Sequence, residues 1–169
     1  MVRESDGGPM TTDLVRATWQ HLQADDPLMA LLGSSTDWPY WLFRWKAYIS
    51  LEGTSESMIV VSQNGSWATA NPHNTMRFPK LQVEIFTDPE RNTLKNPTGR
   101  TTEVRALEVY EALDPLLHMP YGGEVTWGAD TVAVRILGSK RTFGEPEILP
   151  VPEGDGMIRV RQMYEVSLG

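Results

Sequence analysis

The chain has 169 residues with 40% hydrophobic and 22% charged side chains, which predicts a single globular domain over residues 1–169 with one core. Its formal net charge of -7 opposes a general nucleic-acid-binding role, because such proteins neutralise phosphates with clustered lysine and arginine. Cysteine is absent, so disulfides, thiolate metal sites and cysteine nucleophiles are excluded.

The first predicted element is an amphipathic helix over residues 11–24, which Thr11 or Thr12 opens as the N-cap. Residues 1–10, which precede this helix, are expected to form a flexible N-terminal segment. The inward side chains of the helix recur at the helical period. They are Leu14, Val15, Thr18, Trp19 and Leu22.

A second helix start follows directly, where Asp26 precedes Pro27. We expect Asp26 to cap a short helical turn that ends at Gly33, because glycine commonly follows a helix C-terminus. The two segments together predict a helix with a bent end.

An aromatic stretch over residues 38–48 comes next and predicts a half-buried strand. Trp41, Phe43 and Trp45 alternate with polar or aliphatic neighbours, a pattern that favours packing under the helices. Three further aromatics lie off this alternation or at its ends and are candidates for a subunit interface. They are Trp38, Tyr40 and Tyr48.

Two strands joined by a long polar loop are predicted in the middle of the chain. Residues 57–63 form a short apolar strand, and residues 78–87 alternate with a period of two. In the second strand, apolar side chains on one face, such as Val83, alternate with polar ones on the other, such as Glu84. The intervening residues 64–77 are rich in Asn, Gly and Pro and predict a hairpin loop.

The C-terminal third of the chain predicts a helix and two strands. The helix runs from Thr101 or Thr102 to Leu117, with Pro115 bending its last turn. Its expected inward residues are Val104, Leu107, Tyr110, Leu113 and Leu117.

The last two strands are predicted to pair with each other. One has Val132, Val134 and Ile136 on its inner face, and the other is the alternating closing segment 156–169. Between them, residues 137–156 contain three prolines and four glycines and predict an excursion from the sheet edge.

These elements predict an α+β fold, with a mostly antiparallel sheet and two main helices packed on one face. Charged side chains line the other face, which is therefore expected to contact water or a partner. Across strands, arginines such as Arg159 and Arg161 are expected near Glu84 or Glu165.

The sequence contains no catalytic, phosphate-binding or metal-binding motif, and we expect no enzyme activity, cofactor or metal. The three histidines are His21, His73 and His118, and no two have a short metal-ligand spacing. His118 lies at a helix end, where a favourable interaction with the helix dipole explains it. Apolar runs are too short to span a bilayer, which predicts a protein that does not enter a membrane.

Loop residues complete the candidate interface. Trp67 and Trp127 are large aromatics in polar or turn surroundings, which suggests docking. The loop 64–77, with His73 and Arg77, and the excursion 138–156, with Phe143, are candidates for contacts with other subunits. Each loop is equally well explained as a tolerated surface insertion.

From about Asp13 to Leu168 the chain resembles the tail terminator, or tail completion, proteins of long-tailed bacteriophages. The resemblance is carried by an N-terminal amphipathic helix ending in ALLGS and by the strand KLQVEIFTDP, which a polar loop separates from TEVRALEVYEALDPLL. The closing strand RVRQMYEVSLG completes it. The resemblance implies an α+β subunit that closes into a ring, usually a hexamer, on the head-proximal end of the tail tube.

The implied partners are other copies of the chain, the tail tube protein and a neck or head-completion protein. DNA would only pass through the lumen, and the protein would be part of the virion after assembly in the host cytoplasm. Two alternatives stay open. One is a neighbouring neck component, such as a head-tail adaptor or stopper, and the other is a small-ligand-binding or enzymatic module.

Overall fold

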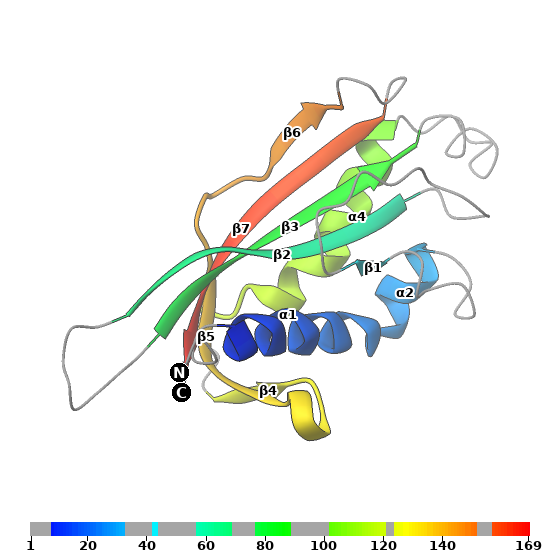
Figure 1. The fold of residues 1–169 in the computed structure, drawn as a ribbon. Helices are drawn as coiled ribbons and strands as arrows, with labels where there is room; N and C mark the ends of the chain where they lie inside the picture. Colours follow the sequence, from blue (N-terminus) through cyan, green and yellow to red (C-terminus); the bar gives the residue numbers. More distant parts are fainter. Residues whose placement is uncertain are drawn as a thin grey trace.

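The computed structural model describes residues 8–32, 42–43, 57–68, 77–88, 102–120, 124–151 and 157–169. Within these ranges, helices lie on one face of a twisted, mostly antiparallel sheet (Figure 1), so the predicted α+β class is confirmed. The helices are α1 Gly8–Gln23, α2 Asp26–Leu32 and α4 Thr102–Leu117, with a short 3-10 helix, η3, at Asp130–Val132. The strands are β1 Leu42–Phe43, β2 Ser57–Ala68, β3 Arg77–Thr87, β4 Val125–Trp127, β5 Val134–Arg141, β6 Glu147–Pro150 and β7 Ile158–Leu168.

The strand order is β1-β2-β3-β7-β5-β4, with β6 also paired to β7. Only the β1–β2 pair is parallel among the described strands. β7 therefore lies in the middle of the sheet, with β3 on one side and β5 and β6 in succession on the other. This confirms that the closing segment is a sheet strand and that it pairs with the strand around Val134.

The core lies between the sheet and the two main helices, and both contact it directly. α1 packs against β2 and β4, whereas α4 packs against β3 and β7. The register stacks the inward residues of neighbouring strands, because Ile59 lies opposite Ile85 and Ile85 opposite Val160. Each of these side chains is buried, as the period-two pattern predicts.

The second face of the sheet, which was expected to contact water or a partner, is buried in part. Met58, Val60 and Glu84 all lie there, and Glu84 is 0% exposed. Arg159 pairs with the Glu84 carboxylate at 3.2 Å, which confirms the expected cross-strand pair. A buried carboxylate needs such a partner, because burial removes the water that would otherwise stabilise its charge.

Both N-terminal helices begin earlier than their cap residues suggested. α1 begins at Gly8, so Thr11 and Thr12 lie inside the helix and neither is its N-cap. In α2 the cap is Asp25, whose Oδ2 accepts a hydrogen bond from the Leu28 amide at 3.0 Å. Asp26 is the first helical residue, where its charge interacts favourably with the helix dipole.

The hairpin arms are longer than predicted, because β2 continues to Ala68 and β3 starts at Arg77. Trp67 pairs with Phe78, and a register shift between Gln63 and Ser66 marks an irregularity in β2. The loop prediction for residues 64–77 was therefore wrong at both ends. Polar side chains do not prevent pairing there, because the ladder bonds are made by the backbone.

The predicted excursion after Ile136 contains two strand segments. Residues 138–141 belong to β5, residues 147–150 form β6, and both segments pair with β7. Only a short turn at residues 142–146 separates the two strands. The prolines were misread as a departure from the sheet, although proline is compatible with an edge strand.

In α4, Tyr110, Leu113 and Leu117 face the core as predicted, whereas Val104 is 46% exposed. Of the aromatic stretch, only Leu42 and Phe43 lie within the described residues, as the backbone of β1. The packing predicted for Trp41 and Trp45 lies outside them.

Candidate interface at the 142–146 turn

The turn at residues 142–146 lies where the partner strand of β7 changes. β5 pairs with β7 up to Arg141 opposite Tyr164, and β6 resumes the pairing with Glu147 opposite Arg161. Gln162 and Met163 therefore face the gap between the two partner strands. One ladder bond persists there, in which the Thr142 amide donates to the Met163 carbonyl at 2.8 Å.

Gln162 fills this gap with its side chain. Its Oε1 accepts a hydrogen bond from the Met163 amide at 2.9 Å, so this amide is satisfied although the ladder is interrupted. Its Nε2 donates to the carbonyl of Phe143 and to the Tyr110 hydroxyl, both at 3.3 Å. Gln162 is buried, and its hydrogen bonds connect the turn to β7 and to α4.

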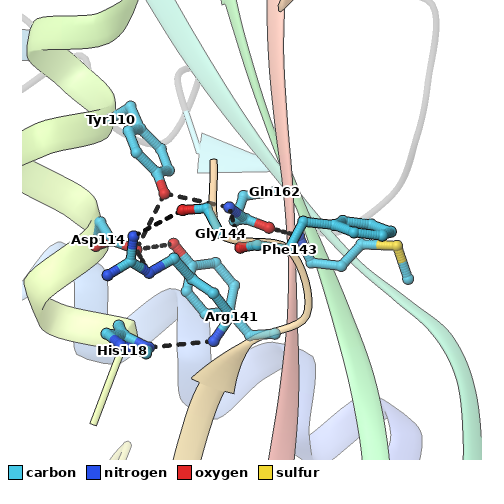
Figure 2. A network of polar contacts seen from close by, with 9 residues as sticks. Tyr110, Asp114, His118, Arg141, Phe143, Gly144 and Gln162 are labelled. Atoms are coloured by element: carbon cyan, nitrogen blue, oxygen red, sulfur yellow. Dashed lines mark hydrogen bonds and ion pairs between the residues drawn. The ribbon is translucent and has the colours of Figure 1, made fainter. Parts of the chain in front are cut away.

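Asp114, in the last turns of α4, is the second anchor (Figure 2). Its Oδ1 accepts hydrogen bonds from Tyr164 at 2.7 Å and from Tyr110 at 3.2 Å. The Arg141 Nε lies 3.5 Å from the same oxygen. Burial is the main reason that the pKa values of Tyr110 and Tyr164 lie above the usual value for a phenol. Both hydroxyls therefore stay protonated and can donate hydrogen bonds.

Arg141 fastens the turn at its other end. Its NH1 donates to the Gly144 carbonyl at 3.1 Å, and its backbone amide donates to Nδ1 of His118 at 3.1 Å. The Nδ1 lone pair of His118 thus accepts a backbone amide of β5. The sequence predicted only a helix-dipole interaction for His118 and did not predict this contact with a strand amide.

Phe143 projects from this anchored turn. Its side chain is 50% exposed, while its carbonyl is held by Gln162. Figure 2 shows the ring on the far side of β7 from Tyr110 and Asp114. An aromatic ring on a fixed backbone loses little entropy when a partner covers it, which suits a protein contact.

The same arrangement offers little for catalysis. Asp114 already accepts two hydrogen bonds and faces Arg141, and the tyrosine hydroxyls are held protonated. Over the described ranges, no three His, Asp or Glu side chains are grouped to hold a metal ion. No helix in those ranges is both long and apolar enough to cross a membrane.

The sequence matches no protein-family model and no curated protein sequence. The fold, however, is similar to that of a chain in the solved structure "Virion of native gene transfer agent (GTA) particle", with a TM-score of 0.58. The two chains are 17% identical, and the match covers 92% of this chain and 93% of that chain. At this identity the likeness concerns the fold, and it extends over nearly the whole of both chains.

Trp127 is not the exposed docking aromatic that its turn-like surroundings suggested. It is 0% exposed and stacks on His21, with ring centroids 5.0 Å apart and planes at 14°. The Nε2 of His21 donates to the carbonyl of Leu116 at 2.9 Å. Trp127 and His21 thus join β4, α1 and the end of α4 in the core.

The other predicted interface residues are only partly placed. The backbones of Trp67 and Arg77 lie in the far ends of β2 and β3. Trp38, Tyr40, Tyr48 and His73 lie outside the described residues. Among the candidates whose exposure the structure gives, Phe143 is exposed and Trp127 is buried.

Sequence reasoning missed Gln162, Asp114 and Arg141 as a connected group. One signal was present, because Gln162 is a polar residue at an inward position of the alternating closing strand. A buried amide there requires partners from other elements. The elements that supply the partners of Gln162 depend on the turn between β5 and β6. The prediction from the sequence was wrong in that region.

Proposed function

We propose that the chain is a tail terminator of a phage-like particle, which forms a ring on the head-proximal end of the tail tube and stops its growth. The observation that carries the proposal is the fold likeness to a virion chain of a gene transfer agent particle over 92% of this chain. The segments that resemble tail terminator proteins add to it.

The local structure is compatible with a subunit of an assembly. A cyclic ring needs two different surfaces on each subunit, one for each neighbour. The anchored turn with Phe143 supplies a fixed apolar projection of the kind that such a surface uses. The net charge of -7 suits a ring through which DNA passes without adhering.

Electron microscopy of the purified protein tests the ring directly. We expect discrete closed rings, and in their presence a polymerising tail tube protein should stop at a defined length. Tubes that grow without a length limit, even with the chain in excess, would contradict the proposal. A chain that stays monomeric in both the absence and the presence of tube ends would contradict it equally.

A pull-down against purified tube and neck proteins separates the terminator from a head-tail adaptor or stopper. The terminator should bind the end of the tube in the absence of any head component. An adaptor should bind the head side and leave tube length unchanged.

A further inference from the structure

The outer edge of the β5–β6 line is the side of these two strands that faces away from β7. In an antiparallel ladder, alternate residues direct their amide and carbonyl groups to the partner strand, and the residues between them direct theirs outward. The backbone hydrogen bonds of β5 and β6 fix which residues face outward.

On β5 the outward amides of Ser139 and Arg141 already have partners. β4 pairs with the start of the strand, from Val134 to Ile136. Ser139 exchanges two hydrogen bonds with Met119, at 2.6 and 3.3 Å. The next outward amide is that of Arg141, and the His118 ring accepts its hydrogen bond.

On β6 the outward donors are removed by proline. Val151 donates to the Met157 carbonyl at 3.1 Å, which makes this a hydrogen-bonded pair. By alternation Leu149 and Glu147 also face β7, so the outward positions are 150, 148 and, just before the strand, 146. Positions 150 and 146 are prolines, which have no amide hydrogen. Ile148 alone presents an outward amide.

The strand is also marked as an exposed edge by its side chains. Ile148 is 38% exposed, and Phe143 in the preceding turn is 50% exposed. No described residue pairs with the outer edge of β6. Exposed apolar residues beside such a strand edge are the usual conditions for edge-to-edge association. An added strand, however, needs donors and acceptors in alternation, and this edge has one donor across three outward positions.

We propose that Pro146, Pro150 and His118 together guard the outer edge of the β5–β6 line, so that a second copy of the chain cannot add a strand there. The prolines delete two outward donors, and the His118 ring occupies a third. Contacts across this edge are then made by side chains, which limits association to matched surfaces. This inference does not depend on the terminator function and holds for any assembly of the chain.

The double variant Pro146→Ala with Pro150→Thr tests the guard, because it restores two outward amides without adding charge. We expect the double variant to self-associate about tenfold more tightly than the parent protein, because roughly two additional hydrogen bonds can form between copies. Sedimentation velocity over a concentration series measures this association, and thioflavin T binding reports added strand structure. In the double variant, hydrogen exchange of the new amides at positions 146 and 150 should slow as the protein concentration rises.

Pro27→Ala is the matched control, since Pro27 is exposed in α2 and away from the sheet edge. It should leave association unchanged. His118→Ala is a second, independent variant, which frees the Arg141 amide and should also strengthen association. If both edge variants remain folded by circular dichroism and associate no more than the parent, the guard is refuted, and the prolines serve only to stiffen the strand.

Discussion

Gly128 shows how one residue type can be required by its surroundings. It links β4 to η3 with a φ of 81°, in the left-handed region that glycine tolerates best. A Cβ at this position would lie 2.7 Å from the carbonyl oxygen of Val132 and 3.0 Å from the Cα of Ala17. Both are backbone atoms, which cannot move aside cheaply.

We therefore expect Gly128→Ala to lower the free energy of unfolding by about 2–3 kcal/mol, through backbone strain and overlap with α1. Urea denaturation followed by circular dichroism measures the change. Gly144→Ala is the matched control, because an added Cβ there meets no atom within 4 Å. The control should change stability by less than about 0.5 kcal/mol. Equal losses in the two variants would argue against the contact with Ala17.

His21 makes stability depend on pH. Burial is the main reason that its pKa lies below the ordinary value of 6.5, and the Leu116 carbonyl and Asp25 only partly oppose this. The unfolded chain thus binds the proton more readily than the folded one. The stabilisation from neutral His21 is present above pH 6.5 and is lost as the pH falls through that value toward the lower folded pKa.

We expect the free energy of unfolding of the wild-type protein to fall more steeply between pH 7.5 and 5.5 than that of His21→Gln. The variant itself should be less stable at pH 7.5, because it loses the stacking on Trp127. Denaturation at three pH values gives both slopes. Parallel slopes would show that protonation of His21 is not coupled to folding.

At the scale of the element, the start of α2 distinguishes two adjacent aspartates. Asp25 accepts the Leu28 amide, whereas Asp26 is the first residue of the helix. Asp25→Ala should therefore cost about 1 kcal/mol of stability, and Asp26→Ala should cost less, since only its interaction with the helix dipole is lost. Thermal denaturation of the pair measures the difference. A larger loss of stability in Asp26→Ala than in Asp25→Ala would show that Asp26 is the N-cap.

The anchor of the 142–146 turn is also open to test. Gln162→Leu leaves the amide of Met163 and the carbonyl of Phe143 without their partner, which should cost about 1–3 kcal/mol. Hydrogen exchange should accelerate at Met163 and remain slow at Val166, the internal reference in the same strand. Uniform acceleration along β7 would indicate general unfolding rather than a loosened turn.

The sequence predicted elements well where one side-chain pattern covers a whole element. The inward faces of β3 and β7 follow strict alternation, so Val83 and Val160 were placed correctly. Prediction failed where pairing depends on the backbone, as at the polar ends of the hairpin and in β6. Proline and asparagine signal turns statistically, but edge strands accept them when their amides are not needed.

The candidate site was predictable only in part for a related reason. An exposed Phe143 could be expected from its place among glycine and proline. Its anchor joins α4, β5 and β7, and such long-range polar contacts have no local sequence pattern. Trp127 was wrongly predicted to be exposed because its neighbours in the sequence are polar. Its packing partner, His21, lies more than a hundred residues away in the chain.

For the whole molecule, assembly should depend on the projecting turn more than on apolar exposure in general. Phe143 is 50% exposed and Val104 is 46% exposed, but only Phe143 lies on the turn that the polar network anchors. Phe143→Ser should abolish ring formation while changing the stability of the isolated subunit by no more than about 1 kcal/mol. Val104→Ser is the control, and its rings should form normally.

Negative-stain electron microscopy scores the rings, and urea denaturation of both variants reports the stability of the subunit. Both substitutions remove an apolar side chain that is about half exposed, so ring loss in Phe143→Ser alone would point to the position of Phe143. Rings that persist in Phe143→Ser would assign the subunit contact to another surface. Rings lost equally in both variants would mean that α4 faces a neighbour as well, and the anchored turn would then have no special role in assembly.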